Sequence, residues 1–133
     1  LGAQLKTVED IMITGKRIPF INENVKMKQA TKIMSKMGLG FLIIRDSKKK
    51  TLGIITDGQI RRSLEKSNNF QTLSVKKIMT KNPITIDKDE LAAKALSMMN
   101  SKQITSLLVS NNKKPSNIIG VLHIHTILKS NIS

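Results

Sequence analysis

The sequence predicts a mixed α/β (α+β) fold built from two similar halves, each with the element order β-α-β-β-α. The first observation is an internal repeat, because VEDIM at residues 8–12 returns as VKKIM at residues 75–79. The second is that each half joins a stretch of helical apolar spacing to two strand-like stretches rich in branched residues. The third is that these strands are apolar on both faces and need cover on both sides. We therefore expect the halves to pack about a pseudo-twofold axis around a shared cleft.

The first half opens with a short helix and an extended stretch. Thr7, followed three residues later by Asp10, forms a capping-box pattern that predicts a helix start. An extended stretch is expected at residues 19–22. The apolar residues of segment 27–37 recur at helical spacing, and Gly38 suits the left-handed end of that helix. The methionines of this stripe are expected to fill the core.

Two strands and a last helix complete each half. GFLIIRD and TLGIIT flank a lysine-rich turn in the first half, and TSLLVS and NIIGVLHI take their place in the second. We expect Asp57 to cap the last helix of the first half, with Ile60 and Leu64 facing inward. The halves are expected to span residues 1–68 and 69–133.

Composition limits the class of protein. The chain has 133 residues and no cysteine, which excludes disulfides and thiolate metal sites. No apolar run approaches a membrane span, so we expect a soluble, cytoplasmic protein without a membrane partner. Its first residues, LGAQLKT, read as mid-chain sequence, so we expect a fragment of a longer protein.

The net charge of +14 raises the question of a nucleic-acid partner. The clusters at residues 48–50 and 113–114 fall in expected hairpin tips, which favours solvated loops. Only three Phe residues and no Tyr or Trp are present to stack on bases. We therefore predict no nucleic-acid partner.

The tandem β-α-β-β-α pattern resembles the cystathionine-β-synthase (CBS) domain pair, or Bateman-type module, over essentially the whole chain. VEDIM, TDGQIRR and GVLHIHTILKS are similar to the C-terminal regulatory region of bacterial arabinose-5-phosphate isomerases. The resemblance implies a preceding sugar-isomerase domain that interconverts ribulose 5-phosphate and arabinose 5-phosphate for synthesis of Kdo, a lipopolysaccharide sugar. It also implies a homodimer through the CBS helices and a higher homo-oligomer in the parent.

No catalytic residues are expected in this fragment, because it has no Ser-His-Asp arrangement and no P-loop. Asp87, Asp89 and Glu90 cluster at an expected helix start, where the helix dipole explains them. No cofactor is expected to be required.

The resemblance implies a nucleotide in the cleft, held by a Thr at each strand-to-helix corner and by an Asp three residues later. Thr56 matches the first of these positions, but Gln59 stands where the Asp belongs. In the second half His123 takes the Thr position and Thr126 the Asp position. Both ribose-binding carboxylates are therefore absent, which casts doubt on AMP or ATP and leaves room for an acidic sugar nucleotide such as CMP-Kdo.

Physical chemistry supports a small anionic ligand at these corners. Helix-start N–H groups attract phosphate or carboxylate. Asp57 opposes an anion unless it folds back as a cap, and Thr56 fits a plain structural cap equally well. At most one of Arg61 and Arg62 is expected to face the cleft. The candidate ligand-binding residues are Thr56, Asp57, Gln59, His123, His125 and Thr126.

His123 and His125 share a face if their strand persists. A metal site lacks an evident third ligand, so we predict none, and donation to a ligand or a structural role remain open. A different function is also open, in which the pair serves only as a dimerisation module with an empty cleft. The exposed members of Ile60/Leu64 and Ile127/Leu128 would supply its surface.

Overall fold

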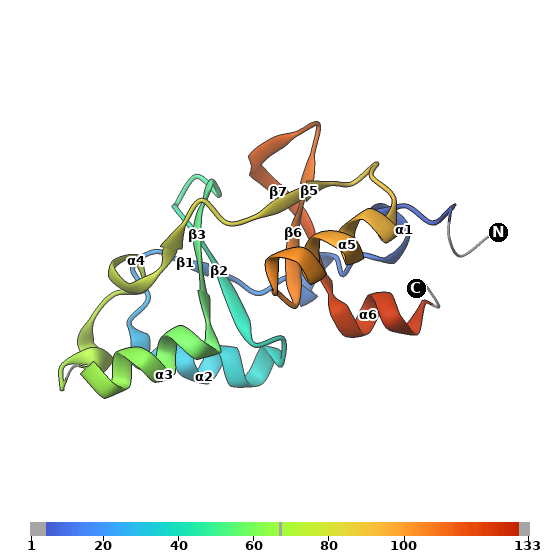
Figure 1. The fold of residues 1–133 in the computed structure, drawn as a ribbon. Coiled ribbons are helices and arrows are strands. Elements are labelled where there is room, and N and C mark those ends of the chain that lie inside the picture. Colours follow the sequence, from blue (N-terminus) through green and yellow to red (C-terminus); the bar gives the residue numbers. More distant parts are fainter. Residues whose placement is uncertain (1–4, 67, 131–133) are drawn as a thin grey trace. The chain divides into compact units, whose positions relative to one another are not determined.

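The computed structural model describes residues 5–66 and 68–130, and it confirms the mixed α/β fold class with two sheets and their helices (Figure 1). The chain divides into two compact units. One unit is Pro19–Pro83, and the other combines Leu1–Ile18 with Ile84–Ser133. No helix in the described part of the chain has the length and apolar character needed to span a bilayer.

The Pro19–Pro83 unit is a four-stranded sheet with helices. Its elements are β1 (Phe20–Asn22), α2 (Met27–Met37), β2 (Phe41–Arg45), β3 (Thr51–Thr56), α3 (Asp57–Lys66), η3 (Phe70–Thr72), α4 (Val75–Ile78) and β4 (Thr80–Lys81). The sheet order is β1-β2-β3-β4, with β1 parallel to β2 and the other pairs antiparallel. Gly38 ends α2 in the left-handed conformation, as predicted.

The core of this unit lies between the sheet and its helices. It contains Ile21, Met27, Ala30, Met34, Leu42, Ile44, Ile55, Ile60, Phe70 and Val75. All of β2 from Phe41 to Ile44 is buried, which confirms that both faces of this strand are covered. The expectation that Leu64 faces inward is wrong, because its side chain is 52% exposed, whereas Ile60 is buried.

The second unit repeats this plan with a three-stranded sheet. Its elements are α1 (Val8–Ile11), η2 (Gly15–Arg17), β5 (Thr85–Asp87), α5 (Ala92–Lys102), β6 (Ser106–Asn111), β7 (Lys114–His123) and α6 (Ile124–Lys129). β5 pairs with β6 in parallel, and β6 pairs with β7 antiparallel. The predicted capping box forms, since the Thr7 N–H donates to Asp10 Oδ2 at 2.8 Å. This bond is the main reason that the pKa of Asp10 is lowered.

The leading segments of the repeats, defined as residues 6–13 and 73–81, change places. The later segment packs in the Pro19–Pro83 unit, where the Met27 N–H donates to the Leu73 carbonyl at 2.8 Å. In the other unit, the Ala92 N–H donates to the Lys6 carbonyl at 2.9 Å. Each leading segment therefore completes the unit that holds the strands of the other repeat, which repeat boundaries read along the sequence do not reveal.

One glycine in each unit allows its leading segment to cross the sheet closely. A Cβ added to Gly120 would lie 2.6 Å from Met12 Sδ and 2.9 Å from the Ile13 carbonyl oxygen. A Cβ on Gly53 would collide with the Thr80 carbonyl in the same way. The repeated methionines of VEDIM and VKKIM therefore lie over the repeated glycines.

Candidate functional site

The first candidate corner lies where β3 passes into α3. The Thr56 N–H donates to Gln59 Oε1 at 2.9 Å, and the Gln59 N–H donates to Thr56 Oγ1 at 3.3 Å. These reciprocal bonds form a capping box, in which a Thr is followed three residues later by a Gln. The expectation that Asp57 is the cap is therefore wrong, because Asp57 is the exposed first residue of α3 and Thr56 caps the helix.

Gln59 also binds a residue that sequence reasoning missed. Its Nε2 donates to Thr80 Oγ1 on β4, so both ends of the Gln59 amide have partners. Thr80 lies in the later leading segment, and the matching residue of the other unit is the apolar Ile13, which pairs with Val121 on β7. The sequence repeat therefore offered no signal for this contact.

Few donors at this corner are available to a ligand. The Asp57 N–H already donates to the Gly40 carbonyl at 2.9 Å. Among the described residues, the Gly58 N–H has no hydrogen-bond partner. A Cβ on Gly58 would lie 3.3 Å from Arg62 Nη1, so this guanidinium lies beside the helix start. The corner thus offers one free N–H donor and a nearby cation, since the Thr56 hydroxyl already donates to Gln59 Oε1 at 3.4 Å and accepts from the Gln59 N–H.

The second candidate corner lies where β7 passes into α6. The strand ends at His123, so the condition for both histidines to share a strand face is not met, and His125 belongs to the helix. Their rings nevertheless stack, with centroids 4.9 Å apart and planes inclined by 26°. The His125 N–H donates to His123 Nδ1 at 3.2 Å, which makes His123 the N-cap of α6.

The state of the His123 ring follows from this cap. Partial burial lowers the pKa of His123, and the neighbouring His125 lowers it further. Because Nδ1 of the neutral ring accepts a hydrogen bond, its proton must reside on Nε2. His123 therefore presents one N–H donor at the position that Thr56 takes in the first corner.

Thr126 completes the second corner from the first turn of α6, and its side chain is half-buried. The Ile124 N–H donates to the Thr105 carbonyl at 2.8 Å, which matches the bond that Asp57 makes in the other unit. The structure thus brings Thr56, Asp57 and Gln59 together in one unit and His123, His125 and Thr126 in the other. Among the described residues, no group of three or more histidines or carboxylates is placed to hold a metal ion.

The acidic residues ahead of α5 have a structural role. Asp87 accepts hydrogen bonds from the N–H groups of Lys113 at 2.9 Å and Asp89 at 3.2 Å. These bonds, that of Lys113 first, lower the pKa of Asp87. Its carboxylate ties the β5–α5 connection to the β6–β7 turn. The expectation that the helix dipole explains these residues is wrong, because the first turn of α5 holds no acidic residue.

Comparisons with known proteins give the family and the fold. A family model described as CBS domain matches residues 8–66 and 75–132. The uncharacterized protein RP505 of Rickettsia prowazekii is 35% identical over all of this chain and 40% of its own length. The arabinose 5-phosphate isomerase KdsD of Salmonella typhi is 34% identical over 96% of this chain and 38% of its own length. The chain therefore spans about two fifths of the length of these relatives.

Solved structures have the same fold. CBSX2 in complex with AMP matches with a TM-score of 0.80 at 17% identity, over 94% of this chain and 95% of that one. The CBS domain pair of MJ0100, in complex with 5-methylthioadenosine and S-adenosyl-L-methionine, matches with a TM-score of 0.78 at 27% identity, over 94% of each chain.

Proposed function

The chain belongs to the CBS-domain family, and on that premise we propose that it is a regulatory CBS pair that binds a nucleotide or sugar nucleotide. The candidate ligand-binding residues are Thr56, Asp57 and Gln59 at the β3–α3 corner of one unit and His123, His125 and Thr126 at the β7–α6 corner of the other. The bound adenosine ligands of CBSX2 and MJ0100 support this ligand class.

We further propose that the parent protein is an aldose–ketose isomerase. The match to KdsD supports a parent that interconverts ribulose 5-phosphate and arabinose 5-phosphate in the cytoplasm, on the route to Kdo and lipopolysaccharide. This chain would regulate that reaction and would not catalyse it. Regulation requires that the ligand bind one arrangement of the parent more tightly than another.

The observation that carries the ligand proposal is the set of donors at the β3–α3 corner. The Gly58 N–H and the Arg62 guanidinium favour an anionic group at the start of α3, where the exposed carboxylate of Asp57, which is not the cap, opposes it in part. Gln59 adds no negative charge, and its amide is held in place by Thr56 and Thr80. Because position 59 carries Gln and not Asp, no carboxylate there repels an anion. The affinity of an acidic ligand such as CMP-Kdo would gain more from this than that of AMP.

The test measures binding of AMP, ATP, CMP and CMP-Kdo by calorimetry and by thermal shift. A ligand at 100 times its Kd should stabilise the fold by about 2.7 kcal/mol. Gln59→Glu keeps the oxygen that accepts from the Thr56 N–H but adds a charge. At ~8 Å and an effective dielectric constant of 20–40, that charge repels an anion by about 1–2 kcal/mol. Affinity should then fall roughly 5- to 30-fold.

The control is Gln71→Glu, which adds the same charge at an exposed position of η3, away from the corner. Its effect on binding should be small. The proposal fails if none of the four ligands raises the melting temperature at millimolar concentration, or if both variants weaken binding equally.

The dimerisation module remains the second candidate because one leucine is exposed on the last helix of each repeat. Leu64 on α3 is 52% exposed and Leu128 on α6 is 55% exposed, whereas Ile60 and Ile127 are buried. We expect sedimentation to show a homodimer that Leu64→Lys and Leu128→Lys weaken. A strictly monomeric chain at high concentration would remove this candidate.

A further inference from the structure

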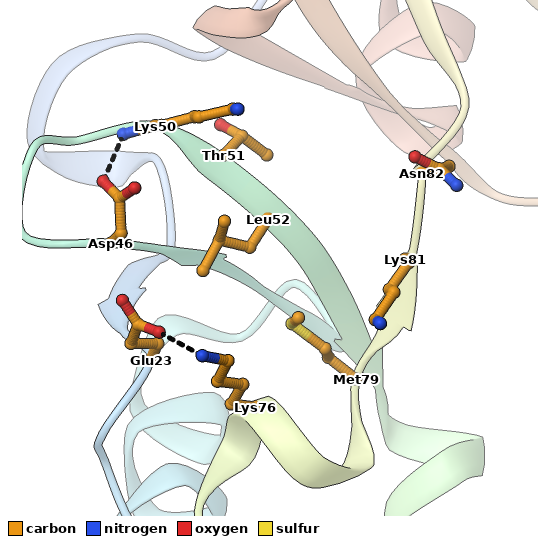
Figure 2. Close-up of a pocket in the computed structure, with 9 residues that line it drawn as sticks. All are labelled: Glu23, Asp46, Lys50, Thr51, Leu52, Lys76, Met79, Lys81 and Asn82. Carbon is orange, nitrogen blue, oxygen red and sulfur yellow. Dashed lines mark hydrogen bonds and ion pairs between the residues drawn. The ribbon is translucent and has the colours of Figure 1, made fainter.

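A cavity of about 540 Å³ lies in the Pro19–Pro83 unit, and no part of it belongs to the two candidate corners (Figure 2). Its size lies in the range of small-molecule sites. Leu52 of β3 and Met79 line its interior, and both pack against the core of the unit. The cavity is built from the β2–β3 hairpin, the turn after β1, and the segment that carries α4 and β4.

The two carboxylates in its wall have partners of their own. Glu23 forms an ion pair with Lys76 at 3.1 Å. Asp46 Oδ1 accepts from the backbone N–H groups of Lys48 and Lys50, both at 2.9 Å. Figure 2 shows these two arrangements on adjacent sides of the cavity. Both carboxylates therefore already have partners, although the second oxygen of each can still accept hydrogen bonds.

Two ammonium groups in the wall are not matched in this way. Lys50 and Lys81 line the cavity, and within residues 5–66 and 68–130 neither forms an ion pair with a carboxylate. Thr51 and Asn82 lie beside them and add a hydroxyl and an amide. The wall thus offers two cations for a dianion, with donors and acceptors for hydroxyl groups around them.

We propose that this cavity binds a small hydroxylated phosphate monoester, with its phosphate between Lys50 and Lys81. Its carbon body lies over Leu52 and Met79, and its hydroxyls bond to the free oxygens of Asp46 and Glu23. This site is separate from the β3–α3 corner. Thr51 and Thr56 stand at opposite ends of β3, which places the two sites ~16 Å apart along the strand.

The test titrates the isotope-labelled 133-residue chain with ribose 5-phosphate, inorganic phosphate and ribose, and follows backbone amides by NMR at 0.15 M salt. The salt screens weak surface contacts between exposed charges. Ribose 5-phosphate should shift the amides of Thr51, Leu52, Lys81 and Asn82 in a saturable way. It should bind at least fivefold more tightly than phosphate, and ribose alone should cause no shifts.

The variants locate the phosphate contact. Lys50→Gln combined with Lys81→Gln should weaken binding at least tenfold. Lys48→Gln changes an exposed lysine of the same hairpin that does not line the cavity, and it should change the Kd less than twofold.

Three outcomes overturn the proposal. One is the absence of shifts at the cavity amides, and another is shifts confined to Thr56 and Gly58. The third is equal binding by the double variant and the Lys48→Gln control. Equal affinity for phosphate and ribose 5-phosphate would overturn the recognition of hydroxyl groups.

Discussion

Gly120→Ala should destabilise the chain strongly, because the added methyl group has no room. Gly120 lies on β7, beneath the point where the earlier leading segment crosses it. The new carbon would lie 2.6 Å from Met12 Sδ and 2.9 Å from the Ile13 carbonyl oxygen. The backbone of Gly120 is outside the left-handed region, so the cost is steric and not conformational.

The magnitude follows from what must move. A normal carbon–oxygen contact is ~3.3 Å or longer, so the Ile13 carbonyl must retreat by about 0.4 Å or more. That carbonyl accepts from the Val121 N–H at 3.0 Å, and the Ile13 N–H donates to the Val121 carbonyl at 2.8 Å. Overpacking costs about 1–3 kcal/mol, and each weakened hydrogen bond up to ~1.5 kcal/mol. Alanine also makes the unfolded chain less flexible than glycine does, which stabilises the fold by about 0.4–1 kcal/mol. We expect a net loss of about 2–4 kcal/mol.

The assay is urea and thermal unfolding of the wild type and the variant. At about 3–4 °C per kcal/mol for a chain of this length, the melting temperature should fall by ~6–16 °C. Hydrogen exchange should show faster opening at the amides of Ile13 and Val121. Gly53→Ala, at the matching position of the other unit, should behave alike.

Gly58→Ala is the matched control. Its Cβ would meet only the flexible end of Arg62 at 3.3 Å and Thr56 Oγ1 at 3.9 Å. Since alanine is favoured over glycine in a helix by ~1 kcal/mol, this variant should be neutral or stabilised. If Gly120→Ala stays within about 0.5 kcal/mol of the wild type, the normal range for a surface substitution, the close-crossing argument is refuted.

Two further predictions concern pH. Burial lowers the pKa of His123 below its ordinary 6.5, so the unfolded chain takes up this proton first and stability should fall as the pH drops from 6.5 through the folded pKa. His123→Asn, which retains an N-cap side chain, should flatten that part of the stability profile; an NMR titration giving His123 a pKa of 6.5 or more would contradict it. The N–H groups of Lys113 and Asp89 lower the pKa of Asp87 below 3.8, so the stability from this carboxylate is present above that value and is lost as the pH falls through the folded pKa. Asp87→Ala should therefore lower the urea midpoint at pH 7 more than at pH 2.5, and Asp89→Ala, at an exposed neighbour, should not.

The local features of the fold were predictable because their signals are local. The capping box at Thr7 and Asp10 and the end of α2 at Gly38 both depend on residues within one or two turns. The same rule holds at the β3–α3 corner, where Thr56 and Gln59 form the Thr-x-x-Gln pattern directly, and the prediction of Asp57 as the cap is wrong.

The exchange of leading segments could not be predicted from sequence. α1 and α4 have four residues each, and the sequence of so short a helix does not indicate which sheet it packs against. The contact between Gln59 and Thr80 depends on this exchange, so it was missed as well. The cavity of Figure 2 was missed for the same reason, because Met79 and Lys81 reach it only from the exchanged segment.

The exchange also governs how this molecule responds to being cut in two. A break near residue 68 would leave the earlier piece without β4, the edge partner of β3, and the later piece without Ile13 alongside Val121. Each piece would then display unpaired backbone groups that the other piece is shaped to cover. Separately made fragments should be poorly soluble alone and should recover their structure on mixing, as in fragment complementation.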